Sequence, residues 1–140
     1  MMSMGYATLP RGIRNNNPGN LRRTADRWQG LHPEQTDPEF FRFTAPEWGY
    51  RALMRTLQNY RRRHGCATLA DFIYRWAPVR ENDTAAYLHA VCADLQVPPT
   101  YVPDVDDRDT LCALAAAISR VENGTPARMD DVHRGWELLN

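Results

Sequence analysis

From Pro46 onward, the sequence repeats one pattern that leaves little choice of fold. Apolar residues recur at spacings of three and four, and proline or glycine separates the segments that carry this pattern. Such spacing is typical of short helices that each bury one face. The pattern predicts five helices, which begin near Pro46, Thr68, Asp83 or Thr84, Asp109 and Met129. We therefore expect a mostly α protein.

The first third of the chain, up to about Ala45, has a different character. It is rich in Asn, Pro, Gly and Arg, and it contains RNNNPGNLRR followed by DRWQGL and EFFRF. These residue types favour turns and short strands over helices. We therefore expect a helical bundle around a cleft, with a small irregular or β lobe near the N-terminus.

Size and charge restrict the class of protein. A chain of 140 residues is expected to form one domain, residues 1–140, and to bury enough surface to be stable without disulfides. Its 17 basic residues balance 17 acidic ones, so no overall positive charge attracts nucleic acid. The cysteines and histidines show no metal-ligand spacing, so we expect reduced thiols, no metal and no cofactor.

The N-terminal sequence MMSMGYATLP lacks a basic region followed by an apolar stretch, so it does not resemble a signal peptide. No apolar run approaches the roughly 20 residues that a membrane span requires, so we expect no membrane insertion. A protein made in the cytoplasm without a signal peptide needs other machinery if it is to act outside the cell membrane.

Glu122 is the first candidate for chemistry. Within ALAAAISRVENG it lies on the same helical stripe as Leu111, Ala115 and Ile118, at the end of the predicted helix. Partial burial and the negative end of the helix dipole both favour the protonated carboxyl group. A general acid requires such a group. The alternative is a last-turn glutamate that points to water.

Four further residues are candidate substrate contacts: Asn17, Asn20, Trp28 and Tyr87. Asparagines around a Pro-Gly turn offer donors and acceptors to hydroxyl and acetamido groups, although composition alone favours a loop that satisfies its own backbone. Trp28 is able to stack on a sugar face, but its residue type favours core packing. Tyr87, one turn into a helix, either presents its hydroxyl to a cleft or packs in the core.

Glu81, in VRENDT, is a second carboxylate to consider. The positive end of the helix that follows it stabilises the charged carboxylate, which suits a base or nucleophile better than an acid. The alternative is a charge that only complements the helix end, paired with Arg80.

The stretch NNNPGNLRRTADRWQGL, followed by FFRFTAPEWGYRALMRTLQNY, resembles part of the lysozyme-like superfamily. The resemblance is to bacterial glucosaminidases and lytic transglycosylases, and it covers about residues 15–60. In those enzymes an Asn-Asn segment leads to a Trp-x-Gly, an aromatic-rich strand and a helix that ends in Leu-x-x-Tyr. The same Arg-Asn-Asn-Asn-Pro-Gly-Asn signature also resembles short phage and prophage proteins, often described as virion structural proteins, over most of the chain.

The resemblance has one departure. In those enzymes the catalytic glutamate ends a helix that precedes the Asn segment, whereas no acidic residue precedes Asn15 here. ALAAAISRVENG resembles the missing helix, placed near the C-terminus. The resemblance thus implies a circular permutation, with Glu122 as the acid and the Asn loop beside it, which is tolerable because domain termini often lie close together. It also implies that Tyr87, in ENDTAAY, is the cleft tyrosine of the glucosaminidases.

These features predict a peptidoglycan-cleaving glycosidase, either a lytic transglycosylase or a lysozyme or glucosaminidase. As the only acid, Glu122 would protonate the glycosidic oxygen and then act as base. The muramic 6-hydroxyl would attack and give a 1,6-anhydro product, or the substrate's acetamido group would assist. If Glu81 lies across the cleft, two-carboxylate hydrolysis applies instead.

The alternative prediction is a non-catalytic phage virion structural protein or glycan-binding protein with the same fold. The expected partners are peptidoglycan glycan strands and, for export, a virion, a holin or a secretion machinery. The site of action would then be the periplasmic peptidoglycan.

Overall fold

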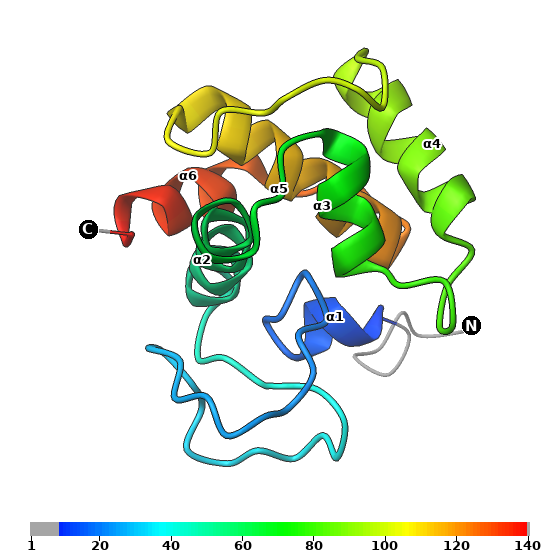
Figure 1. Ribbon diagram of the computed structural model, residues 1–140. Coiled ribbons are helices and arrows are strands. Elements are labelled where there is room, and N and C mark those ends of the chain that lie inside the picture. Colours follow the sequence, from blue (N-terminus) through cyan, green and yellow to red (C-terminus); the bar gives the residue numbers. More distant parts are fainter. Residues whose placement is uncertain (1–8, 140) are drawn as a thin grey trace, which may run out of the picture.

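Helices account for nearly all regular structure in the computed structural model, which describes residues 9–139 (Figure 1). In this part of the chain the helices are α1 Arg11–Arg14, α2 Pro46–His64, α3 Leu69–Trp76, α4 Thr84–Leu95, α5 Arg108–Asn123 and α6 Met129–Glu137. The mostly helical class is therefore confirmed. The single turn α1 was not expected from the sequence.

The helix boundaries follow from capping residues in the sequence. Thr68 and Asp71 form a capping box at the start of α3, in which each side chain accepts from the other residue's backbone N–H. The Asp83 carboxylate caps α4. Asp107 caps α5, which therefore begins one residue before the predicted Asp109. Gly124 ends α5 with a φ of 68°, a left-handed conformation that favours glycine.

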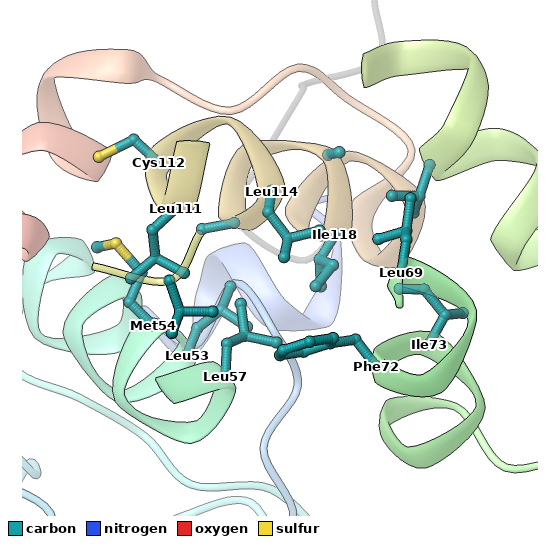
Figure 2. Close-up of a cluster of buried hydrophobic side chains, with 14 of the residues drawn as sticks. Leu53, Met54, Leu57, Leu69, Phe72, Ile73, Leu111, Cys112, Leu114 and Ile118 are labelled. Atoms are coloured by element: carbon teal, nitrogen blue, oxygen red, sulfur yellow. The ribbon is translucent and has the colours of Figure 1, made fainter. Parts of the chain in front are cut away.

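The main core lies between α2, α3 and α5. Figure 2 shows apolar side chains from these three helices meeting in one cluster, among them Leu53, Leu57, Phe72, Leu114 and Ile118. All of these side chains are fully buried. Helix α6 packs against α2, and α4 packs against α5, so that α2 and α5 form the centre of the bundle.

The segment before α2 contains less β structure than expected. Its only antiparallel pairings among the described residues are two isolated bridges, Arg22 with Phe40 and Leu31 with Phe43. Side-chain hydrogen bonds replace a continuous ladder: the Gln35 amide donates to the carbonyls of His32 and Arg42 and accepts from the Arg42 N–H. Of the two forms that we expected, an irregular or a β lobe, the structure has the irregular one, because a side chain satisfies backbone groups that a strand would pair.

A second, smaller core holds this segment against α2. It consists of Phe41, Phe43 and Ala52, with partly buried apolar neighbours. In Figure 1 the blue and cyan loops of this segment lie together beside α2. Within the described residues, no helix combines the length and the apolar character that crossing a bilayer demands.

Candidate active site

Glu122 lies in the last turn of α5, where side chains from two distant segments hold its carboxylate. The Asn20 amide Nδ2 donates to Oε1 at 2.9 Å, and the Tyr87 hydroxyl donates to Oε2 at 2.8 Å. Asn20 comes from the N-terminal loop and Tyr87 from α4. The structure therefore brings together three of the six predicted site residues around one carboxylate.

Trp76 fixes the direction of the Tyr87 hydroxyl. Its indole Nε1 donates to the Tyr87 oxygen at 3.1 Å, so the hydroxyl proton is free to point at Glu122. Tyr87 is only 7% exposed, and this burial, with the Glu122 charge, holds the pKa of its hydroxyl well above the usual range. Tyr87 therefore remains a proton-bearing donor to Glu122 throughout the physiological pH range.

Asn20 reaches Glu122 from a loop whose turn is held by hydrogen bonds. Its φ of 49° is left-handed, a conformation that asparagine tolerates better than most residues. Asn17 fixes this turn: its amide donates to the carbonyls of Leu21 and Phe41, and its Oδ1 accepts from the Leu21 N–H at 3.0 Å. Asn17 is fully buried, so it supports the loop and does not offer the substrate contact that we expected.

A second contact joins the end of α5 to the same loop. The Asn123 amide donates to the Pro18 carbonyl at 2.9 Å and to the Ser119 carbonyl at 2.9 Å. Gly12 of α1 lies so close that an added Cβ would be 2.5 Å from Asn123 Oδ1 and 3.0 Å from Asn20 Oδ1. The absence of a side chain at Gly12 therefore allows α1, the Asn loop and α5 to meet next to Glu122.

An open groove of about 400 Å³ runs past this carboxylate. Residues from the N-terminal loop, α2, α3, the α3–α4 connection and α5 form its walls, and Asn20 and Glu122 are among them. The other polar and aromatic residues of the lining are Arg22, Phe40, Tyr60, Arg75, Trp76, Glu81 and Asn82. The lining therefore combines aromatic side chains with carboxylate, amide and guanidinium groups that are able to hydrogen-bond to a ligand.

Glu81 lines the groove but is already paired. Its carboxylate lies 2.9 Å from the Arg22 guanidinium, and Arg22 also lies 3.7 Å from Glu39. The expected alternative partner, Arg80, is thus replaced by an arginine from the N-terminal loop. This ion pair connects the two walls of the groove.

Trp28 is not part of the groove. It is half-buried and packs against the small core of Phe41, Phe43 and Ala52. Trp28 therefore packs against the small core, as its residue type favoured, and it does not contribute to the groove beside Glu122.

Trp76, Arg22 and Arg75 are groove residues that sequence reasoning did not single out. The spacing of α3 assigns Trp76 to a core stripe, and the indole does pack there while its N–H reaches Tyr87. No local signal identifies this contact, because Tyr87 belongs to the next helix. Only the packing of α3 against α4 places the two side chains together.

No group of His, Cys, Asp and Glu side chains within residues 9–139 is arranged to hold a metal ion. Cys66, Cys92 and Cys112 are free thiols, and burial raises the pKa of each.

A comparison with known proteins identifies one informative relative. The chain is 36% identical to Protein P5 of Pseudoalteromonas phage PM2 over 146 aligned positions, which cover 96% of this chain and 89% of that protein. No family model matches the chain. Identity at this level over nearly the whole of both chains indicates common ancestry.

Proposed function

We propose that this chain, which belongs to the same family as Protein P5 of Pseudoalteromonas phage PM2, cleaves the glycan strand of peptidoglycan. Glu122 is the general acid. The observation that carries the proposal is the pair of neutral donors, Asn20 and Tyr87, that aim one carboxylate into an open groove.

The Tyr87 hydroxyl suits both protonation states that the reaction requires. It donates to Glu122 when the carboxylate is charged, and its oxygen has a second lone pair that accepts when Glu122 carries a proton. Glu122 first gives this proton to the glycosidic oxygen as the bond to the sugar breaks. It then takes a proton from the muramic 6-hydroxyl, whose oxygen bonds to the anomeric carbon and gives a 1,6-anhydro end.

For the fold, we propose a circularly permuted lysozyme-like domain. The supporting observation is the 2.9 Å hydrogen bond between Asn20 and Glu122, which joins residues 102 positions apart. A permuted enzyme requires this meeting of the Asn loop with the end of the catalytic helix. The phage relative fits a protein that reaches the periplasm inside a virion or by a holin or another export route.

The test is digestion of purified Gram-negative peptidoglycan by the wild-type protein and by Glu122→Gln, with mass spectrometry of the soluble products. We expect the wild type to release muropeptides and the variant to lose at least about 100-fold in rate. Glu137→Gln changes an exposed glutamate on α6 and is the matched control.

Two results would change the conclusion. If Glu122→Gln digests as fast as the wild type, Glu122 is not the acid. If neither protein releases muropeptides while both remain folded, the non-catalytic virion or glycan-binding protein replaces the enzyme as the function.

A further inference from the structure

Arg75 is a cation in the groove that forms no ion pair with a carboxylate of the described residues. Its side chain is exposed on α3, and none of the ion pairs formed within residues 9–139 includes it. Its guanidinium carbon lies 5.3 Å from the centre of the Tyr60 ring, which is partly buried and packs against the main core. Arg75 therefore has a positioned side chain and an unmatched charge.

The second arginine in the groove provides the contrast. Arg22 also lies over an aromatic ring, 5.2 Å from the centre of Phe40, but Glu81 and Glu39 neutralise its charge. Charged side chains without a protein partner in a groove are candidates for binding the opposite charge of a ligand. Of the two cations, Arg75 is the one available for this purpose.

We infer that Arg75 binds a carboxylate of the substrate and makes the groove selective for anionic glycan strands. The inference deepens the proposed function and rests on it, because the stem peptides of peptidoglycan carry carboxylates and the neutral polymer of N-acetylglucosamine does not. A guanidinium offers a planar fork of N–H donors that matches a carboxylate. Stacking on Tyr60 orders this fork before the ligand arrives, which lowers the entropy cost of binding.

The experiment measures binding without cleavage. Glu122→Gln is the background, and its cosedimentation with two insoluble substrates is compared: native sacculi, and sacculi whose carboxylates have been converted to amides with carbodiimide and methylamine. Arg75→Gln is added to this background, and Arg63→Gln, an exposed arginine of α2 outside the groove, is the charge-matched control. Thermal melting confirms that each variant is folded.

We expect Arg75→Gln to weaken binding to native sacculi by about five- to tenfold and to leave binding to amidated sacculi unchanged. The affinity of Arg75→Lys for native sacculi should lie between that of the background and that of Arg75→Gln, because lysine keeps the charge but loses the planar fork. Arg63→Gln should bind both substrates as the background does. Added salt should weaken the Arg75-dependent part of the binding.

The inference is overturned if Arg75→Gln binds native sacculi as tightly as the background does, or if it weakens binding to both substrates equally. It is also overturned if the background protein does not sediment with native sacculi. Failure of cleavage is a separate result: a wild type that releases no muropeptides but sediments in an Arg75-dependent way disproves the enzyme and leaves the carboxylate site standing.

Discussion

At the scale of single residues, the Tyr87 hydroxyl determines how the Glu122 carboxylate is held. Tyr87→Phe removes the 2.8 Å hydrogen bond to Oε2 and leaves the Trp76 N–H without its acceptor. We expect kcat for peptidoglycan cleavage to fall by about 10- to 100-fold with little change in KM, because a misplaced acid slows proton transfer. Initial rates of muropeptide release over a range of substrate concentrations measure both quantities.

The control for this variant is Tyr74→Phe, which removes a hydroxyl from a tyrosine of α3 that is 47% exposed. We expect it to keep wild-type kinetics. Tyr87→Phe should also lower the free energy of unfolding by about 1–2 kcal/mol, since the partly buried Trp76 N–H loses its partner. If kcat is unchanged while stability falls by this amount, Tyr87 supports the fold and has no role in positioning Glu122.

The sequence pattern predicts the position of some site residues and not of others. The stripe through Leu111 and Ile118 places Glu122 at the partly buried end of its helix, and the structure has it there. Asn17 and Asn20 look equivalent in RNNNPGNLRR, yet one is fully buried and the other reaches Glu122. The direction of each asparagine depends on the backbone turn, which residue types alone do not specify.

At the scale of elements, the contact between α1 and α5 depends on Gly12. An alanine there would place its Cβ 2.5 Å from Asn123 Oδ1 and 2.8 Å from the Asn17 carbonyl oxygen. Backbone atoms yield little, so we expect Gly12→Ala to cost about 1–3 kcal/mol in the free energy of unfolding. It should also reduce activity by displacing Asn20 from Glu122. Urea unfolding and muropeptide release measure the two effects.

Gly65→Ala is the matched control. Gly65 ends α2 with a φ of 66°, and no atom would contact its added Cβ. We expect Gly65→Ala to lower the free energy of unfolding by about 1 kcal/mol through backbone strain alone and to retain activity. Equal activity of both alanine variants would show that the α1–α5 contact does not control the position of Asn20.

A second element-scale contact fixes α1 to the loop before α2. The Arg11 guanidinium donates to both oxygens of Asp37, at 2.6 and 2.7 Å, and the Asn15 amide donates to the same carboxylate. These donors hold the pKa of Asp37 well below its usual range. A lowered folded-state value means that the stabilisation is present above the unfolded-state value of 3.8 and is lost as the pH falls below it.

Asp37→Asn tests this dependence. We expect the variant to melt at a lower temperature than the wild type near neutral pH, and the difference to shrink as the pH is lowered from about 5 to about 2. Thermal melts across this range measure the difference. Asp26 is an exposed carboxylate without an arginine partner among the described residues. The melting temperature of Asp26→Asn should therefore differ little from that of the wild type at any pH in this range. A constant difference for Asp37→Asn would mean that the ion pair does not contribute to stability.

The elements themselves follow closely from local sequence. Thr68 with Asp71 and Pro46 identify the starts of α3 and α2, because caps and first-turn prolines act within a few residues. The segment before α2 was harder to predict. Its aromatic residues suggest strands, but Gln35 satisfies the backbone groups that would pair, and that contact depends on tertiary structure.

At the scale of the whole molecule, the groove joins segments that are distant in the sequence. One wall comes from the N-terminal loop and the other from α3 and the α3–α4 connection, and the Arg22–Glu81 ion pair links the two. Helical periodicity predicts α3, which contributes to one wall, but not the conformation of the loop that forms the other. The meeting of the walls depends on how α3, α4 and α5 pack, so the sequence does not show that Arg22 and Trp76 line the same groove as Glu122.

This arrangement makes Glu81 the residue that distinguishes the two reaction schemes. A carboxylate paired with Arg22 at 2.9 Å and about 40% exposed is poorly placed to serve as nucleophile or base. We expect Glu81→Gln to retain the wild-type rate within about threefold, whereas loss of a general acid or base costs at least about 100-fold. If the proposed reaction is correct, the released muropeptides should be one water lighter than hydrolysis products, because the 6-hydroxyl of the muramic residue would attack in place of water.

Mass spectrometry of products from the wild type, Glu81→Gln and Glu122→Gln measures rate and chemistry together. Glu81→Gln leaves Arg22 with Glu39 as a partner, so the groove wall should persist. If Glu81→Gln is as inactive as Glu122→Gln and the wild-type products carry the added water, two carboxylates act together. The Arg22–Glu81 pair must then open during the reaction, and Arg22→Gln should raise the hydrolysis rate by freeing Glu81.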